Sequence, residues 1–416
     1  MGVKGLYAFL KKKFPKLLHS EYLLEICFGK KILIDISSYI YKYKAVYKEK
    51  WLKMFIGFIL FFKKYNLHIT FIFDGKAPLL KDEELKRRFL VKENLQDKAE
   101  TLYMDLEKYK NTGEKTEFLI DIMKKILKNQ NKKNQLKVKK LLHKKNEETK
   151  DNNIILDVDM LEGRLKVIEG QIFSITDEDI WSLKTILTLL GIGYLQSNTE
   201  AETLACYLCN QGLANVIISE DSDALTYVNE NIITISKINV QDGSCIVVYK
   251  DEVLEELELT KEQFTDFCIL SGTDYNDNIY KCGIVNSLKY IKKYKTIEKF
   301  IKNVNKDEKK EIKKQKSFER IEKFKEIRDV FNHKISPMGR FYITDHIDQN
   351  DQKEQKFHKK DEEKFEIIKH IPICDDDVDL EKAFDFLEKL NISLHKEIKK
   401  AWNLGKELEV ELEFIE

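Results

Sequence analysis

The sequence predicts an α/β protein with a mostly parallel central sheet flanked by helices. Three short apolar segments carry this prediction, namely Lys31–Asp35, Ile69–Asp74 and Val216–Asp221. Each is typical of a buried strand, and segments with helical periodicity lie between them. Buried parallel strands have such continuous apolar runs, and parallel sheets bind ligands just beyond the carboxyl ends of their strands. Because all three segments end in Asp, we expect their carboxylates to meet at one edge of the sheet.

Length and composition set the frame for this fold. The chain has 416 residues, of which 43% are hydrophobic and 34% charged, and its net charge is only +1. One large or two modest domains are expected. No apolar run reaches the ~18–20 residues that span a bilayer, so we expect no membrane association. Seven scattered cysteines without a secretory leader indicate reduced thiols inside a cell, and Cys206 and Cys209 are expected to pack in the core rather than bind zinc.

Further elements follow from local patterns. The first 28 residues predict a short helix and, after Pro15, a second helical turn, and Trp51 to Phe62 predicts a longer helix. Strands are predicted at Asn231–Ile238 and Ser244–Tyr249, and a helix from Thr260. His346–Lys364 has almost no apolar content and predicts a disordered insertion. The helical pattern then returns over residues 379–402.

A highly charged region covers residues 80–170. Lys81, Arg87 and Arg88 open a segment compatible with a helix, on which Lys81 and Arg88, seven residues apart, would share a face. From Lys124 to Lys145 there are ten lysines and no acidic residue. Two interpretations stay open for this run: an ordinary solvated face, or a basic arm over a substrate channel.

Two close carboxylate pairs dominate the stretch from 198 to 223. Glu200 is expected at or before the start of a helix with Glu202 in its first turn, because residues two apart do not share a helix face. Asp221 and Asp223 are expected on a turn after a strand. A plainer interpretation makes Thr199 to Glu202 a helix capping box and the aspartates a solvated turn.

Seven carboxylates are thus candidates for one acidic cluster: Asp35, Asp74, Glu200, Glu202, Asp221, Asp223 and Asp274. No His or Cys lies among them, which favours hard, oxygen-preferring cations such as Mg²⁺ over zinc. Four or more carboxylates in one place need cations to balance their charge. Two Mg²⁺ ions about 3.5–4 Å apart can activate water and stabilise the leaving oxygen in phosphodiester hydrolysis.

The chain resembles the flap endonuclease branch of the XPG-like structure-specific 5′ nucleases. The resemblance rests on MGVKGLYAFL, ILIDISSYIY, FIFDGKAPLLKDEELKRR, LLGIGYLQSNTEAETLACYL, ISEDSDALTY, FTDFCILSGTDY and KCGIVNSLKYIKKYKTIEKF. The later FKEIRDVF and DLEKAFDFLEKLNISLHKEIKKAW are similar to C-terminal core helices of that family. Residues of about 105–165 and 334–366 lie outside the resemblance. It implies a PIN-like nuclease core with a helical arch and a helix-hairpin-helix-like DNA clamp.

The resemblance assigns roles to individual residues. It implies that the seven carboxylates bind the metal ions, with Asp35 and Asp74 also counted as catalytic. Lys81 and Arg88 match basic residues that contact the scissile phosphate, next to Arg87 as a further DNA contact. Tyr41 matches an aromatic residue that stacks on a base, for which core packing is the alternative. Gly2 matches a glycine that places the amino terminus near the active site.

The clamp departs from the family. The segment Asp274–Phe300 is similar to the duplex-binding clamp, in which backbone carbonyls hold a potassium ion. Of the usual Gly-Ile-Gly-Pro turn, only the second glycine is kept in Lys281-Cys282-Gly283-Ile284. The sequence therefore leaves potassium open, while Cys282, Gly283 and Ile284 are still expected to contact the DNA backbone.

Five regions are expected: a nuclease region (1–104), a Lys-rich arch or insertion (105–170), a second nuclease region with the clamp (171–333), the charged insertion (334–366) and a helical C-terminal part of the core (367–416).

The resemblance implies a monomeric flap endonuclease with 5′–3′ exonuclease activity. It also implies two Mg²⁺ ions (or Mn²⁺ in their place), branched or flapped DNA as substrate, and a location in the nucleus or another compartment of DNA replication. No sliding-clamp motif, Gln-x-x-aliphatic-x-x-aromatic-aromatic, is present, so a sliding-clamp partner is left open. The alternatives are a 5′-exonuclease or junction resolvase of the same family, an RNA-cutting enzyme, and a non-catalytic DNA-binding scaffold.

Overall fold

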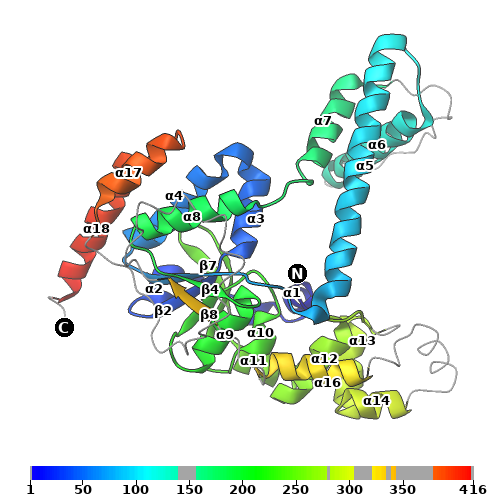
Figure 1. The fold of residues 1–416 in the computed structure, drawn as a ribbon. Coiled ribbons are helices and arrows are strands. Elements are labelled where there is room, and N and C mark those ends of the chain that lie inside the picture. Colours follow the sequence, from blue (N-terminus) through cyan, green and yellow to red (C-terminus); the bar gives the residue numbers. More distant parts are fainter. Residues whose placement is uncertain are drawn as a thin grey trace. The chain divides into compact units, whose positions relative to one another are not determined.

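The computed structural model describes residues 2–138, 156–278, 282–303, 321–333, 339–342 and 378–413. Its strands are β1 His19–Tyr22, β2 Lys31–Asp35, β3 His68–Phe73, β4 Tyr194–Ser197, β5 Val216–Ile218, β6 Ile233–Ile238, β7 Ser244–Val248 and β8 Gly339–Tyr342 (Figure 1). Its first α-helices are α1 Leu6–Lys13, α2 Leu23–Cys27, α3 Ser37–Tyr47, α4 Trp51–Lys64, α5 Asp82–Thr112, α6 Glu117–Val138, α7 Val158–Glu169, α8 Asp177–Leu189 and α9 Ala201–Asn210. The later ones are α10 Ala224–Tyr227, α11 Lys250–Leu257, α12 Lys261–Ser271, α13 Ile284–Tyr294, α14 Ile297–Asn303, α16 Ile321–Phe331, α17 Leu380–Lys389 and α18 His395–Glu413. Short 3₁₀ turns lie at Pro15–Leu17, Lys48–Lys50 and Leu79–Lys81.

Two predictions fall outside the described residues. They are the disordered insertion His346–Lys364 and the clamp residue Lys281. The C-terminal part of the lysine run, residues 139–145, also lies outside them.

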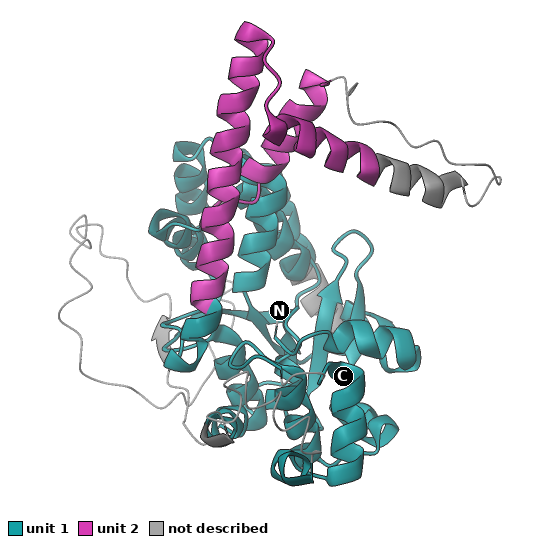
Figure 2. Cartoon of the chain, turned by 90° about the vertical axis from the view of Figure 1, so that its right-hand side faces the viewer, with its two compact units in different colours: residues 1–84, 175–416 teal, residues 85–174 magenta. Residues whose placement is uncertain are grey.

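The chain forms two compact units. Unit 1 contains residues 1–84 and 175–416, and unit 2 contains residues 85–174 (Figure 2). The five-region division expected from the sequence stays a prediction.

Unit 1 is built on an eight-stranded sheet in the order β1-β7-β6-β5-β2-β3-β4-β8. The five central strands, from β6 to β4, pair in parallel, and the strands at both ends pair antiparallel. The predicted mostly parallel α/β sheet is thus confirmed. Because β5, β2 and β3 are direct neighbours, the chain segments that leave their carboxyl ends begin side by side.

The sheet has helices on both faces, and the strand residues show why. Side chains alternate between the faces of a strand. In β2, Leu33 packs in the cluster with α1, α9 and α12, whereas Ile32 and Ile34 pack in the cluster with α3, α4 and α8. In β5, Ile217 faces the first cluster and its two neighbours face the second. Both faces are therefore buried, as continuous apolar runs require.

Strand β1 was not predicted. The second helical turn expected after Pro15 is the 3₁₀ turn Pro15–Leu17, and the chain then forms strand β1 before helix α2. Residues His19–Tyr22 pair antiparallel with β7, in the register His19↔Val247 to Tyr22↔Ser244. This edge strand is polar and half-buried, so its backbone pairing with a distant segment decides its structure rather than its own hydrophobic pattern.

Unit 2 has a small helical core of its own. Helix α5 has no Gly or Pro from Asp82 to Thr112 and ends at Gly113, which has the left-handed φ of 72°. Leu102 and Leu106 of α5 pack with Leu119 of α6 and Leu161 of α7. Within the described chain, no helix combines the length and the apolarity needed to cross a membrane.

Candidate active site

Three aspartates lie where the central strands end. Asp35 is the last residue of β2, Asp74 directly follows β3, and Asp221 comes three residues after β5. Asp35 is buried, and its carboxylate accepts hydrogen bonds from the Ser37 N–H (3.1 Å) and the Ser219 hydroxyl (3.2 Å). The Asp35 charge interacts with those of Asp74 and Asp221. The expected meeting of these carboxylates at one sheet edge is what the structure shows.

The start of α9 brings the glutamate pair to the same edge. Glu200 is the N-cap residue and Glu202 lies in the first turn, as predicted. The side chain of the N-cap residue makes no capping hydrogen bond, so the capping-box interpretation of Thr199 to Glu202 is wrong. Instead, the Asp74 carboxylate accepts a hydrogen bond of 2.7 Å from the Ala201 N–H. A carboxylate at a helix N-terminus is favourable, and this bond ties the end of β3 to α9.

Asp223 and Asp274 complete the group, and Gly2 lies against them. Asp223 is fully buried on the turn after Asp221, whose Oδ1 accepts a hydrogen bond of 3.3 Å from the Asp223 N–H. Asp274 follows the C-terminal end of α12, and its Oδ1 accepts one of 3.3 Å from the Gly2 N–H. Gly2 has a φ of 79°, and a Cβ there would lie 1.9 Å from Asp221 Oδ1. No side chain fits at position 2 without moving the carboxylates.

Lys81 supplies positive charge to this cluster. Its buried Nζ donates a hydrogen bond to Glu200 Oε1 and lies 3.4 Å from Asp274 Oδ2. Lys81 lies in the 3₁₀ turn before α5, so the helix face that it was expected to share with Arg88 does not include it. In this structure its ammonium balances two of the predicted metal ligands.

Two tyrosines support Glu200 from the core. The Tyr275 hydroxyl donates a hydrogen bond to Glu200 Oε2, and it is paired in turn with the Tyr227 hydroxyl at 2.5 Å. Both tyrosines are buried, and both rings pack against Phe331 of α16. The two carboxylate oxygens of Glu200 are thereby held by Lys81 on one side and by Tyr275 on the other.

Burial and mutual repulsion dominate the electrostatics. Burial and then the charge of Asp74 raise the pKa of Asp35 to about 8. Burial, followed by the charges of neighbouring aspartates, raises the pKa values of Glu202 and Asp223 well above their ordinary range. Burial alone lowers the pKa of Lys81, but the charges of Glu200, Glu202 and Asp274 raise it overall. Among the described residues, seven carboxylates near the ammonium of Lys81 leave an excess of negative charge that favours the binding of cations.

The donor set fits divalent cations by its chemistry. All seven side chains offer hard carboxylate oxygens, which Mg²⁺ prefers. Among the residues that the structure describes, Glu202 Oε2 and both oxygens of Asp223 are buried without a hydrogen-bond partner, and such oxygens are costly unless something pairs with them. Within the described ranges, no three Asp, Glu, His or Cys side chains lie close enough, as they stand, to enclose a metal ion. The position of a cation site is therefore indicated by the oxygens without hydrogen-bond partners and not by a complete coordination shell.

The other predicted site residues lie elsewhere. Tyr41 is half-exposed on α3, so core packing, the alternative for it, is wrong, and its stacking on a base stays a prediction. Arg87 and Arg88 belong to α5 within unit 2, and their DNA contacts stay predictions. In the clamp turn, Cys282 is buried and Gly283 precedes α13, with Ile284 as its first residue. Cys206 and Cys209 are buried in the core of unit 1, as expected.

Three residues near the carboxylates were not predicted. Ser219 bridges the cluster, donating to Asp35 and accepting a hydrogen bond of 3.1 Å from the Asp221 N–H. Tyr275 directly follows Asp274, which is the one local signal that the sequence offers for it. The Tyr7 hydroxyl on α1 is buried without a partner, and the charges of Asp221 and Glu202 act on it. Its place in the apolar pattern of α1 gives no such signal.

The chain is similar to several known proteins. A model of the XPG N-terminal domain matches residues 1–94, and one of the XPG I-region matches residues 191–274. A probable RAD2-like endonuclease of invertebrate iridescent virus 3 is 34% identical over 72% of this chain and 80% of its own. A second, from invertebrate iridescent virus 6, is 31% identical over 74% of each chain. Flap endonuclease 1-A of Sorghum bicolor is 28% identical over 74% of this chain and 70% of its own.

Solved structures share the fold. The catalytic core of Rad2 in complex with DNA substrate superposes with a TM-score of 0.54 at 15% identity, covering 95% of this chain and 99% of that one. A second Rad2 complex with DNA substrate gives a TM-score of 0.52 at 17% identity, covering 97% and 99% of the two chains. This chain therefore shares its fold with the catalytic core of Rad2.

Proposed function

Because the chain belongs to the XPG/Rad2 family of structure-specific nucleases, we propose that it is a Mg²⁺-dependent 5′ flap endonuclease with 5′–3′ exonuclease activity. Its proposed substrates are branched or flapped DNA, and the family relation and the DNA-bound Rad2 structures support them. We place its work in DNA replication and repair, in the nucleus or another replication compartment.

One observation carries the proposal. Seven carboxylates from five separate parts of the chain interact in one place, at the carboxyl ends of β2, β3 and β5, around oxygens that have no hydrogen-bond partner in the described parts of the chain. A non-catalytic scaffold gains nothing from this arrangement, because burying unpaired carboxylate oxygens destabilises a fold. In a nuclease, the binding of cations and a phosphodiester to these oxygens would offset that destabilisation.

The roles of the chain's own residues follow from their positions. The cluster Asp35, Asp74, Glu200, Glu202, Asp221, Asp223 and Asp274 would hold two Mg²⁺ ions, for which Mn²⁺ can substitute. When bound, these ions supply an activated water and stabilise the leaving oxygen. Tyr275 and Lys81 fix the orientation of Glu200, and Ser219 fixes Asp35 relative to Asp221. Gly2 lets the first residues of the chain approach the cluster closely.

Basic and aromatic residues complete the proposed mechanism. We assign Lys81 and Arg88 to the scissile phosphate, since a guanidinium stabilises developing phosphoryl charge by paired hydrogen bonds. Arg87 and the turn at Cys282, Gly283 and Ile284 are assigned to the DNA backbone. The half-exposed Tyr41 is assigned to stacking on a base.

The test compares two neighbouring acids. Asp221→Asn removes one charge from the cluster, whereas Glu220→Gln removes one from an ion pair with Lys42 outside it. We expect Asp221→Asn to slow Mg²⁺-dependent cleavage of a 5′-labelled flap by at least about 100-fold, equivalent to about 3 kcal/mol, with flap binding nearly unchanged. Glu220→Gln should cleave like the unaltered protein.

Substrate choice is tested in the same assay. A nicked duplex, a four-way junction and a single-stranded RNA are compared with the flap, each in Mg²⁺ and in EDTA. Preferred cleavage of the junction or of the RNA would overturn the flap assignment. Cleavage in EDTA, or an Asp221→Asn variant of normal rate, would overturn the metal-dependent mechanism.

A further inference from the structure

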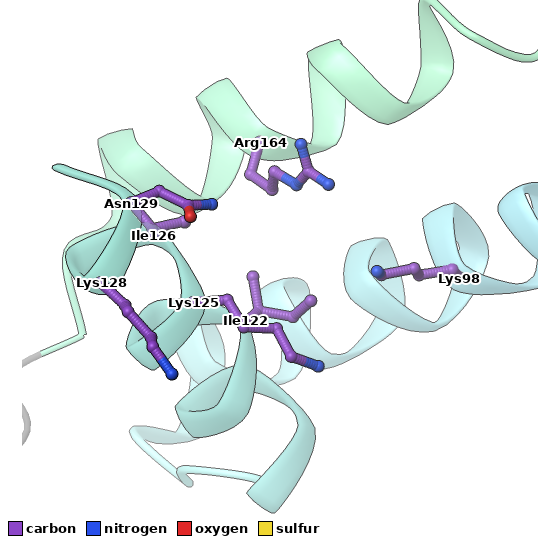
Figure 3. A pocket seen from close by; sticks show the side chains of 7 residues that line it. All are labelled: Lys98, Ile122, Lys125, Ile126, Lys128, Asn129 and Arg164. Carbon is purple, nitrogen blue, oxygen red and sulfur yellow. The ribbon is translucent and has the colours of Figure 1, made fainter. Parts of the chain in front are cut away.

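Unit 2 contains a basic pocket that has no place in the proposed active site. It has a volume of about 350 Å³ and lies where α5, α6 and α7 meet. Its lining residues are Lys98 from α5, Ile122, Lys125, Ile126, Lys128 and Asn129 from α6, and Arg164 from α7 (Figure 3). Each of the three helices thus contributes at least one cation, and none contributes an acid.

These cations are largely unneutralised. Lys98, Lys128 and Arg164 make no hydrogen bond or ion pair with any residue that the structure describes. Lys125 pairs with Asp121 at 2.5 Å, but both side chains are more than half exposed, 62% and 55%, so the pair is weak and screened by salt. The residues that line the pocket include four cations and no carboxylate, which favours a positive potential over it.

The directions of the side chains indicate a ligand. Figure 3 shows the charged ends of Lys98, Lys125 and Arg164 turned toward the same side of the hollow, while Lys128 points away from it. Ile122 is buried and Ile126 is half-buried, and they give the same pocket an apolar wall. A planar guanidinium flanked by two ammonium groups suits a phosphate, and the isoleucines suit a flat apolar ring.

We propose that this pocket binds one nucleotide of a single DNA strand, with its phosphate at Lys98, Lys125 and Arg164 and its base against Ile122 and Ile126. A volume of about 350 Å³ exceeds what a bare phosphate needs and lies within the range of small-molecule sites, about 300–1,000 Å³. The choice of a DNA strand as the source rests on the proposed nuclease function. A free nucleotide has the same chemistry, so the experiment separates the two sources.

The experiment uses the full chain and two matched double variants. Lys98→Ala with Arg164→Ala removes one cation from α5 and one from α7 at the pocket. Lys92→Ala with Lys166→Ala removes one cation from each of the same helices outside the lining residues. Both variants lose two positive charges, so only the pocket distinguishes them. Equal thermal melting curves by circular dichroism show that both are folded.

Binding is measured by fluorescence anisotropy of a labelled thymidine oligomer, in EDTA so that no cleavage occurs. We expect the pocket variant to bind about tenfold more weakly at about 0.1 M salt, and its salt dependence, the slope of log K against log[salt], to be shallower by about 0.7 for the one phosphate contact that is lost. The control variant should stay within about twofold of the unaltered protein. Equal losses in the two variants would overturn the pocket, because they would reflect only a general positive surface.

Two further arms complete the design. Thymidine 5′-monophosphate as competitor should act only at millimolar concentration, and competition as tight as that of the oligomer would assign the pocket to free nucleotides and overturn the strand. An Ile126→Ser variant should weaken binding of the oligomer while leaving the salt slope unchanged, and unchanged affinity would overturn the contact with the base.

Flap cleavage in Mg²⁺ is recorded separately. An unaltered protein that binds through the pocket but never cleaves refutes the proposed function alone, and one that cleaves without pocket-dependent binding refutes the pocket alone.

Discussion

At the scale of single residues, two glycines near the amino terminus can be told apart by their surroundings. Gly2 and Gly5 have nearly the same backbone conformation, with φ values of 79° and 78°. A Cβ at Gly2 would collide with Asp221 and Asp223, whereas one at Gly5 would meet no atom within 4 Å. The two positions therefore separate the effect of backbone strain from the effect of a lost close approach.

We expect Gly2→Ala to reduce the rate of flap cleavage by tenfold or more, because the new methyl group must displace the carboxylate of Asp221. Gly5→Ala carries the same backbone strain, about 1 kcal/mol, without the collision, and should cleave normally. Single-turnover rates of both variants in Mg²⁺ provide the measurement. If both variants lost activity equally, strain in the first turn rather than contact with the carboxylates would be responsible.

The residues of the site were predictable to different degrees. Six of the carboxylates could be found because each follows an apolar strand or lies at the start of a helix, and Asp274 because it follows the end of a helix on a turn; such local patterns are visible in a sequence. Tyr275 could not be assigned to Glu200, because the two are 75 residues apart and only the tertiary fold brings their oxygens together. The pairing of Lys81 with Glu200, 119 residues away, was hidden for the same reason.

At the scale of elements, one arginine joins three helices of unit 1. Arg328 of α16 donates from Nε to Asp266 of α12 (2.5 Å) and from Nη1 to Glu298 of α14 (2.6 Å). Asp266 is buried, and its other oxygen accepts a hydrogen bond from the Ile297 N–H (3.1 Å). The link holds the helices next to Asp274 and the Tyr227–Tyr275 pair together.

Arg328→Ala should lower the free energy of unfolding by about 3 kcal/mol, because it leaves the buried Asp266 carboxylate without its cation. As a control, Lys292→Ala breaks an ion pair with Glu258 on the surface, where the side chains are 39% and 77% exposed. That change should cost less than about 1 kcal/mol. Urea unfolding measures both, and equal effects would show that the Asp266 pair is no stronger than a surface pair.

The elements themselves illustrate what a sequence reveals. Strands β2, β3 and β5 were predictable because both of their faces are buried and their central residues are mostly apolar. Strand β1 was not, because it alternates half-buried and exposed polar residues and depends on its pairing with β7. The parallel centre of the sheet could be predicted, whereas its antiparallel edges are set by partners that are distant in the chain.

At the scale of the whole molecule, a lysine in the core makes stability depend on pH. Lys250 is fully buried at the start of α11, and its Nζ donates to the carbonyl oxygens of Thr226 (3.1 Å) and Val228 (2.6 Å). Burial, with the nearby charge of Lys261, lowers its pKa from 10.5 to about 8. Between these values the unfolded chain binds this proton and the folded chain does not.

The unfolded state therefore holds more protons in this window, and stability rises with pH there. Relative to Lys250→Met, the unaltered protein should gain up to about 3 kcal/mol of unfolding free energy between about pH 7 and about pH 10.5. Urea unfolding of both proteins across that range provides the measurement. A difference that does not change with pH would show that Lys250 loses its proton at the same pH in the folded and unfolded chains.

The place where unit 2 leaves unit 1 also has a consequence. Residues 85–174 lie between β3 and β4, which are neighbouring parallel strands, and α8 alone is long enough to serve as the crossover that such strands need. Residues 85–174 can therefore change in length or sequence during evolution without disturbing the sheet that positions the seven carboxylates. Relatives with the same carboxylate cluster would then differ in which DNA structures they bind. Chimaeras that exchange residues 85–174 between relatives are a practical route to new substrate specificities.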